Sequence, residues 1–177
     1  MIDELFDLPI PHRINEKIIN YLGEKSWNFV NDADRKYKDS FYNIISNPML
    51  KDAGQAVVSY SKYGDYKNDN ILNFFGDHIF YLIQEKSNFK VKDVSRFYWN
   101  LYTPQSVCQE HMDENHIGRF ISAVYNLHTN DGGTQIENQF VESKESQVVL
   151  FKSEKKHKAI SSKTSNFRLS LNIVMEL

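Results

Sequence analysis

The chain has 177 residues, of which 41% are apolar, 14% aromatic and 25% charged, and its formal net charge is −2. This length suits one domain with a sizeable core, and the near-neutral charge gives no whole-chain reason to expect a nucleic-acid or acidic-membrane partner, although Lys152, Lys155, Lys156 and Lys158 leave a local basic patch open. A single cysteine, Cys108, excludes an intramolecular disulfide framework and fits a reducing compartment. Without a signal-peptide pattern or a long apolar run, we expect a cytoplasmic protein with no membrane partner.

The N-terminal half is predicted to be extended at first and then mainly helical. Residues 1–12 contain two prolines and should be extended, whereas residues 14–22 place apolar side chains at helical spacing and end at Gly23. The Asn47-Pro48 pair should end whatever element precedes it, because proline disfavours helix at the residue before it. Residues 55–60 are typical of a strand.

The clearest helix is predicted over residues 70–85. Its apolar side chains form one broad stripe, made by Ile71, Leu72, Phe75, Ile79, Leu82 and Ile83. Asn70 is in place to cap the helix by accepting a hydrogen bond from a first-turn N–H. We interpret the stripe as the face that packs on a sheet, and His78 as a structural or surface histidine.

From residue 91 onward the pattern is typical of short strands separated by turns. Strands are expected over 91–102, 119–127, 134–136, 147–151 and 168–175. Helices followed by strands predict an α+β chain in which the helices brace one sheet of a sandwich or barrel. Nothing separates the two halves, so residues 1–177 are expected to form a single domain.

Two histidines and an aspartate carry the strongest chemical signal. His111 and Asp113 stand two positions apart, and His157 follows the aspartate by 44 residues. On a strand, residues two apart point to the same side, so a histidine from a distant strand can complete a three-cornered face. Two imidazoles and one carboxylate, with other positions left open, suit a non-haem Fe(II) site.

The last predicted strand places a cation on the same polar face. Arg168, Ser170 and Asn172 share one side of the strand, and the apolar residues between them share the other. If the polar side lines the interior of a barrel, Arg168 needs an anionic partner, because an unpaired buried charge is costly. A carboxylate suits it, since guanidinium binds carboxylates as a fork.

The order of these pieces resembles the 2-oxoglutarate- and Fe(II)-dependent oxygenase superfamily over residues 96–177. Residues 123–172 look most like its small prolyl-hydroxylase-like members, including the short versions carried by tailed bacteriophages. The resemblance implies a double-stranded β-helix (jelly roll) over about 91–177, with helical support from about 1–90. It also implies Fe(II) as the metal, 2-oxoglutarate and O2 as co-substrates, succinate and CO2 as co-products, and ascorbate as a candidate stimulant.

The same resemblance assigns roles to individual residues. His111, Asp113 and His157 would bind the metal. Contacts to 2-oxoglutarate are expected from Asn100, Tyr102, Tyr125, Arg168 and Ser170, with Tyr98 and Asn126 as competitors for the tyrosine positions. Gly132 and Gly133 are expected in a turn with positive φ, ahead of a strand that supports the metal face.

The function expected from this reading is hydroxylation of a C–H bond in a protein or small-molecule substrate; the presence of Asp113 argues against halogenation. Two alternatives remain open: a non-catalytic metal-binding jelly-roll protein, and a nucleic-acid demethylase. The demethylase reading is weakened because no second arginine follows Arg168. A metal enzyme that needs no 2-oxo acid is disfavoured by the Arg168-x-Ser170 pair.

Overall fold

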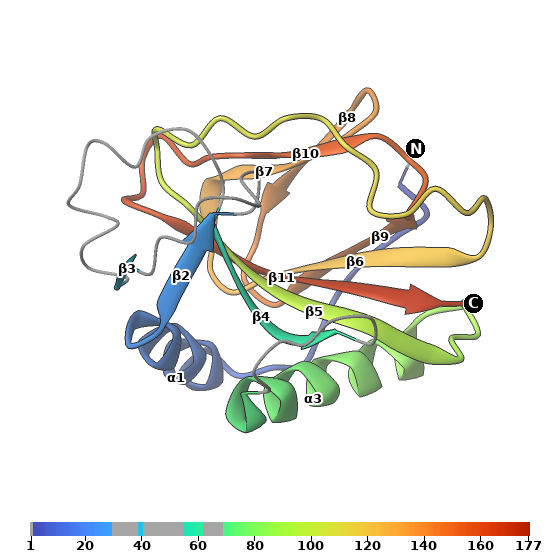
Figure 1. Ribbon diagram of the computed structural model, residues 1–177, viewed down its shortest axis with the longest axis horizontal. Helices are drawn as coiled ribbons and strands as arrows, with labels where there is room; N and C mark the ends of the chain where they lie inside the picture. Colours follow the sequence, from blue (N-terminus) through green and yellow to red (C-terminus); the bar gives the residue numbers. More distant parts are fainter. Residues whose placement is uncertain (1, 30–38, 41–54, 62–68) are drawn as a thin grey trace.

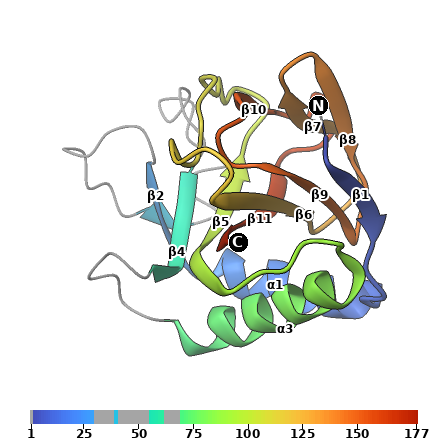
Figure 2. The same cartoon turned by 90° about the vertical axis from the view of Figure 1, so that its right-hand side faces the viewer.

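The chain folds into three layers in the computed structural model, which describes residues 2–29, 39–40, 55–61 and 69–177. Two helices lie along one face of a large antiparallel sheet, and a small sheet lies over the opposite face (Figures 1 and 2). The expectation of an α+β chain with helices against one sheet is confirmed by this arrangement. The Asn47-Pro48 pair lies outside the described residues.

Both expected helices are present, as α1 (His12–Gly23) and α3 (Asn70–Lys86). The cap of α3 is Asp69 and not Asn70, because the Asp69 carboxylate accepts hydrogen bonds from Ile71 N and Leu72 N at 3.1 and 3.0 Å. Asp69 also pairs with Lys25 Nζ at 2.7 Å, which ties α3 to the end of α1. No helix within the described ranges is long and apolar enough to cross a membrane.

The large sheet takes strands from both halves of the chain. Its order is β1 (Glu4–Asp7), β9 (Gln147–Lys152), β6 (Phe120–Asn126), β11 (Arg168–Glu176), β5 (Asp93–Tyr102), β4 (Gln55–Ser61), β2 (Ser26–Phe29) and β3 (Asp39–Ser40). The N-terminal half therefore supplies sheet strands as well as helical support. The strand expected over residues 55–60 is confirmed as β4.

The small sheet has the order β10 (His157–Ile160), β7 (Asn130–Ile136) and β8 (Gln139–Ser143). The expectation that Gly132 and Gly133 form a positive-φ turn is wrong, since both lie within β7. A Cβ on Gly133 would stand 2.0 Å from Val141 O, and one on Gly132 would stand 2.7 Å from Ile160 O. The glycines are needed here for the close approach of neighbouring backbones.

The two faces of the large sheet meet different surroundings. Leu169, Leu171 and Ile173 of β11 are buried in the apolar layer between this sheet and the helices, as the alternation predicted. Part of the space between the two sheets is filled by a second apolar cluster, made by Val124, Ile136, Val141, Val149 and Phe151. Beside this cluster lies a cavity lined by residues of both sheets, many of them polar.

Candidate metal centre and its cavity

His111 and Asp113 lie in the loop between β5 and β6, so the strand alternation used to relate them in the sequence does not apply. The loop is fastened to β10 by a single β-bridge, in which His111 N donates to His157 O at 2.9 Å and His157 N donates to His111 O at 2.8 Å. Asp113 N donates to Ser153 O at 3.0 Å. These backbone bonds, and not strand alternation, bring the three side chains together.

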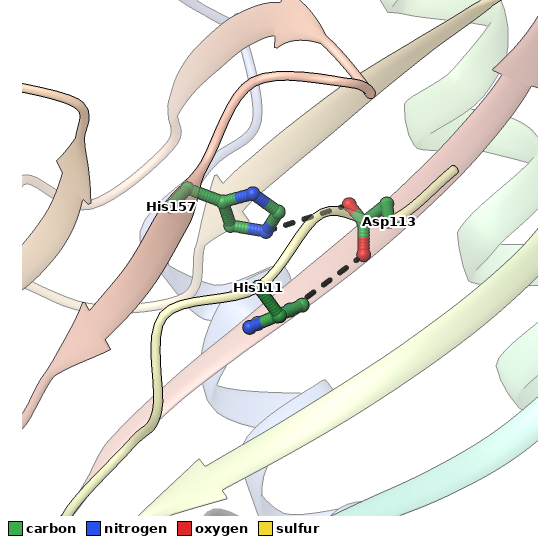
Figure 3. Close-up of side chains that lie close together, drawn as sticks. All are labelled: His111, Asp113 and His157. Carbon is green, nitrogen blue, oxygen red and sulfur yellow. Dashed lines mark ion pairs between the residues drawn. The ribbon is translucent and has the colours of Figure 1, made fainter. Parts of the chain in front are cut away.

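The three side chains converge on one point (Figure 3). His157 Nε2 lies 3.6 Å from Asp113 Oδ2, and His111 Nε2 lies 3.8 Å from Asp113 Oδ1. Their three ligand atoms all fall within 4.8 Å of one another. His157 and Asp113 are buried, whereas the His111 side chain is 54% exposed and borders solvent. Such a cluster is able to hold one metal ion at the rim of the cavity.

Each histidine is held with Nε2 facing the centre. His157 Nδ1 lies 3.0 Å from Lys155 O, and His111 Nδ1 lies 3.1 Å from Gln109 O. A carbonyl oxygen only accepts hydrogen bonds, so both Nδ1 atoms carry a proton and Nε2 is the ring nitrogen available to a metal. Burial lowers the pKa of His157, against the opposing effect of Asp113, and this keeps the imidazole in its neutral, ligating form.

The Asp113 carboxylate is fixed by side chains from three strands. Ser122 Oγ of β6 donates to Oδ2 at 2.6 Å, Asn172 Nδ2 of β11 donates to Oδ2 at 3.2 Å, and Arg96 Nη2 of β5 donates to Oδ1 at 3.1 Å. Burial alone would raise the pKa of this carboxyl, but His157, Arg96 and the two neutral donors outweigh burial and hold it below its ordinary value. The aspartate is therefore an oriented anion.

The cavity beside this cluster has a volume of about 190 Å³. Its wall on the large sheet follows from strand register, because Tyr102, Asn100 and Tyr98 of β5 pair with Arg168, Ser170 and Asn172 of β11. The full lining consists of Arg96, Tyr98, Asn100, Tyr102, Cys108, Gln109, His111, Met112, Asp113, Val124, Thr134, His157, Ala159, Arg168, Ser170 and Asn172. Asn100, Tyr102, Arg168 and Ser170 are thus brought together with the three expected metal ligands.

Arg168 is a buried cation in this wall, with an exposed fraction of 1%. Its Nε donates to Ser143 Oγ at 2.8 Å and its Nη2 to Thr134 Oγ1 at 3.1 Å, while the guanidinium lies 5.2 Å from the centre of the Tyr102 ring. Within the described ranges, Nη1 has no hydrogen-bond partner and no carboxylate lies within ion-pairing distance. Burial lowers the pKa of Arg168, yet arginine stays charged in proteins, so the site lacks an anion.

Tyr125 is placed on the opposite side of the large sheet and does not line the cavity. Its register partner is Leu171, whose side faces the helices, and its hydroxyl donates to Asn15 Oδ1 of α1 at 2.6 Å. Burial raises its pKa to about 12. Its neighbour Asn126 faces the other way and accepts a hydrogen bond from Ser143 Oγ at 3.1 Å. We therefore leave Tyr125 out of the candidate site.

Arg96, Ser122 and Thr134 are site residues to which the sequence reading gave no role at the metal or the co-substrate. The position of Arg96 could have been inferred from the sequence, because residues 96, 98, 100 and 102 share one face of a predicted strand. Ser122 had no such signal, since every residue of β6 is buried and the strand shows no polar side. Asn172 was placed on the polar face of its strand, although its bond to Asp113 was not foreseen.

No protein-family model matches the sequence, and no curated protein sequence gives a significant match. Solved structures do match. A prolyl-4-hydroxylase from Pseudomonas putida is 16% identical with a TM-score of 0.60, over 98% of this chain and 92% of the other. HygX from Streptomyces hygroscopicus, solved with nickel and 2-oxoglutarate bound, is 11% identical with a TM-score of 0.64, over 97% and 81%.

A third match is SnoK, a non-haem α-ketoglutarate-dependent carbocyclase from nogalamycin biosynthesis. It is 11% identical with a TM-score of 0.59, over 97% of this chain and 79% of the other. This chain has the fold of 2-oxoglutarate- and Fe(II)-dependent oxygenases. At these identities the likeness to the oxygenases establishes the jelly-roll fold, and the particular likeness to bacteriophage versions stays a prediction.

Proposed function

We propose that this protein is an Fe(II)- and 2-oxoglutarate-dependent dioxygenase that hydroxylates a C–H bond of a protein or small-molecule substrate. One observation carries the proposal. Two imidazole Nε2 atoms and an oriented carboxylate converge at a cavity whose wall also holds a buried arginine short of an anion. The oxygenase fold supports the same assignment.

The donor set fits the metal. Imidazole nitrogen and carboxylate oxygen are ligands that Fe(II) accepts, and a set of three leaves other coordination positions for small molecules. His111, Asp113 and His157 would hold the ion, with Ser122, Asn172 and Arg96 keeping the carboxylate in place. Asp113 supplies one negative charge to the centre, and the backbone acceptors at Nδ1 of both histidines leave Nε2 as the nitrogen that faces the metal position.

The charges around the cavity fit the co-substrate. Arg96, Arg168 and Asp113 line the cavity, and Glu114, which is outside the lining, lies with Oε1 3.5 Å from Arg96 Nη1. Two positive and two negative side chains therefore sum to zero. A divalent metal and the dianion 2-oxoglutarate also sum to zero. We assign the far carboxylate of 2-oxoglutarate to Arg168, and further contacts to Tyr102, Asn100 and Ser170.

When bound, iron supplies the oxidising chemistry in which O2 and 2-oxoglutarate convert a C–H bond to an alcohol, with succinate and CO2 as co-products. The chain's own contribution is orientation. Arg168 holds one end of the co-substrate, the three ligands hold the metal at the rim, and Met112, 43% exposed, stands where the cavity opens. A primary substrate would approach on this open side, beside His111.

The proposal is tested by O2-dependent conversion of 2-oxoglutarate to succinate. Parent protein and an Asp113→Ala variant are incubated with Fe(II) and ascorbate, alone and with a panel of peptides, amino acids and nucleotides, and succinate is followed by mass spectrometry. We expect slow turnover by the parent without any primary substrate and none by the variant. Metal binding without succinate above the variant's level would favour the non-catalytic jelly-roll alternative.

A further inference from the structure

Arg96 makes an unusual set of contacts with one of the proposed metal ligands. Its Nη2 donates both to the side chain of Asp113, at 3.1 Å from Oδ1, and to the backbone carbonyl of the same residue, at 3.2 Å. Its Nη1 pairs with Glu114 Oε1 at 3.5 Å, and the guanidinium lies 4.9 Å from the centre of the Tyr98 ring. The Arg96 side chain of β5 therefore contacts two successive residues of the loop, Asp113 and Glu114.

This double contact matters because residues 103–119 connect β5 to β6 without a regular strand. The backbone at the aspartate is attached by Asp113 N and Glu114 N, which donate to Ser153 O at 3.0 and 3.3 Å, and by the His111 bridge to His157. Nη2 holds the backbone carbonyl and Oδ1 at once, and so restricts both the main chain and the χ1 and χ2 angles of Asp113. Ser122 and Asn172 hold the carboxylate from other strands.

The direction of the contact is also specific. Arg96 Nη2 donates to Oδ1 at 3.1 Å, and Ser122 and Asn172 donate to Oδ2 at 2.6 and 3.2 Å. His111 Nε2 lies 3.8 Å from Oδ1 and His157 Nε2 lies 3.6 Å from Oδ2, so Arg96 holds the carboxylate oxygen that is nearer to His111. Arginine and lysine differ in this setting, because the planar fork of arginine loses less freedom for each bond it forms.

We infer that Arg96 is a positioning residue for the metal centre: it locks Asp113 and its loop so that one carboxylate face is presented to the ion. The inference rests on the proposed function, which makes Asp113 a metal ligand. It also has a cost, since a guanidinium close to a divalent cation is repulsive. The inference requires orientation to outweigh repulsion, so that removing Arg96 weakens metal binding.

The experiment compares Arg96→Gln and Arg96→Lys with Arg119→Gln as the matched control. Arg119 also pairs with a carboxylate, that of Glu176 at 2.9 Å, but does not contact the proposed ligands. Mn(II) affinity is measured anaerobically by electron paramagnetic resonance, and thermal unfolding of each metal-free variant is recorded alongside. Loss of partners outside the ligand shell typically costs about 10- to 100-fold in metal affinity.

We expect Arg96→Gln to bind Mn(II) about 10- to 100-fold more weakly, Arg96→Lys to fall between it and the parent, and Arg119→Gln to match the parent. A changed Mn(II) line shape in Arg96→Gln would support altered ligation, which a purely structural role would not produce. Equal or tighter binding by Arg96→Gln would overturn the inference while leaving the proposed function intact. Failure of the parent itself to bind Mn(II) would overturn the metal site and the inference with it.

If Arg96→Gln does not fold, the milder Arg96→Lys variant tests whether Arg96 positions Asp113. Its ammonium keeps the charge and loses the fork, so weaker metal binding with an unchanged unfolding temperature supports positioning. Unchanged binding by a folded Arg96→Lys, together with unchanged line shape, would show that any nearby cation suffices and that the fork does not position Asp113.

Discussion

At the scale of single residues, neighbouring groups restrict the orientation or the solvent contact of the candidate site's side chains. The backbone carbonyls of Gln109 and Lys155 prevent the histidines from presenting Nδ1, and three donors prevent Asp113 from turning. Arg168 is prevented from meeting water by burial, although its Nη1 has no partner in the described part of the chain. Each restriction is a cost of folding that a bound ligand is able to offset.

The first prediction concerns the metal ligands. His157→Ala should lose Mn(II) or Fe(II) binding in an anaerobic titration, because it removes a buried Nε2 from a set of three. The control is His116→Ala, whose side chain is 65% exposed and does not line the cavity. Retention of parental affinity by His157→Ala would show that the metal binds elsewhere.

The second prediction concerns Arg168. Arg168→Leu should bind 2-oxoglutarate more than about tenfold more weakly while keeping its metal affinity, because a charge-assisted bond contributes roughly 1.5–3 kcal/mol. Calorimetric titration of 2-oxoglutarate into Mn(II)-loaded protein measures the change. An Arg168→Leu variant that binds the co-substrate like the parent would move the carboxylate contact to another residue.

The third prediction separates Tyr125 from the site. Tyr125→Phe leaves the buried Asn15 Oδ1 without its 2.6 Å bond, which should cost about 1–3 kcal/mol in the free energy of unfolding. Metal and 2-oxoglutarate affinities should not change, since Tyr125 faces α1. Denaturant unfolding measures the stability loss, and titrations with metal and with 2-oxoglutarate measure the two affinities. A selective loss of co-substrate affinity would contradict the placement of Tyr125 outside the site.

At the scale of elements, the small sheet is built around a close approach of β7 and β8. Gly133 pairs with Glu142 across the two strands, and any side chain at 133 would run into the backbone of Val141. The approach matters to the site because the hydroxyl oxygen of Thr134, the next residue, accepts a hydrogen bond from Arg168 Nη2. Backbone spacing in one sheet thereby sets side-chain spacing in the cavity.

The fourth prediction tests this spacing with two glycine variants. Gly133→Ala should destabilise the protein by about 1–3 kcal/mol or more, because the obstructing atom is a backbone oxygen that cannot rotate away. Gly118→Ala is the comparison: its φ is +70° but its Cβ would meet nothing within 4 Å, so only local strain of about 1 kcal/mol is expected. Equal losses in urea unfolding would contradict the steric argument.

At the scale of the whole molecule, periodicity predicted the cavity-facing side of a strand where polar and apolar residues alternate, and failed where they do not. The polar side of β11 was identified correctly because Arg168, Ser170 and Asn172 alternate with apolar residues. Tyr125 was misplaced because its side is set by register with Leu171, which no local pattern encodes. Strands β8 and β10 were not predicted because they are short. The position of the His111 loop was not predicted because it depends on long-range backbone hydrogen bonds.

The fifth prediction is a pH dependence of stability. Burial, with a further contribution from Arg168, lowers the pKa of His128 below its ordinary value of 6.5, and His128 Nε2 accepts a hydrogen bond from Leu169 N at 3.1 Å. The unfolded chain therefore binds this proton more readily than the folded one. The stabilisation is present above pH 6.5 and is lost as the pH falls through the lowered pKa of the folded state.

The measurement is the free energy of unfolding at pH 7.5 and pH 5.5, values set on either side of about 6.5 for free histidine. The parent should lose stability on acidification, and His128→Gln, which keeps an acceptor but does not titrate, should lose less. The same slope in both proteins would assign the effect to other groups, such as the buried His157.

The charges of Arg96, Arg168 and Asp113, which line the cavity, and of Glu114, which pairs with Arg96, sum to zero, and this balance couples the two proposed ligands to each other. A metal ion arriving alone leaves two uncompensated positive charges near a poorly solvated wall, and 2-oxoglutarate arriving alone leaves two negative ones. Each ligand should then tighten the binding of the other by the same factor, as reciprocity of equilibrium coupling requires. The protein would hold iron most firmly when the co-substrate is plentiful, and its iron content would follow the cellular level of a central metabolite.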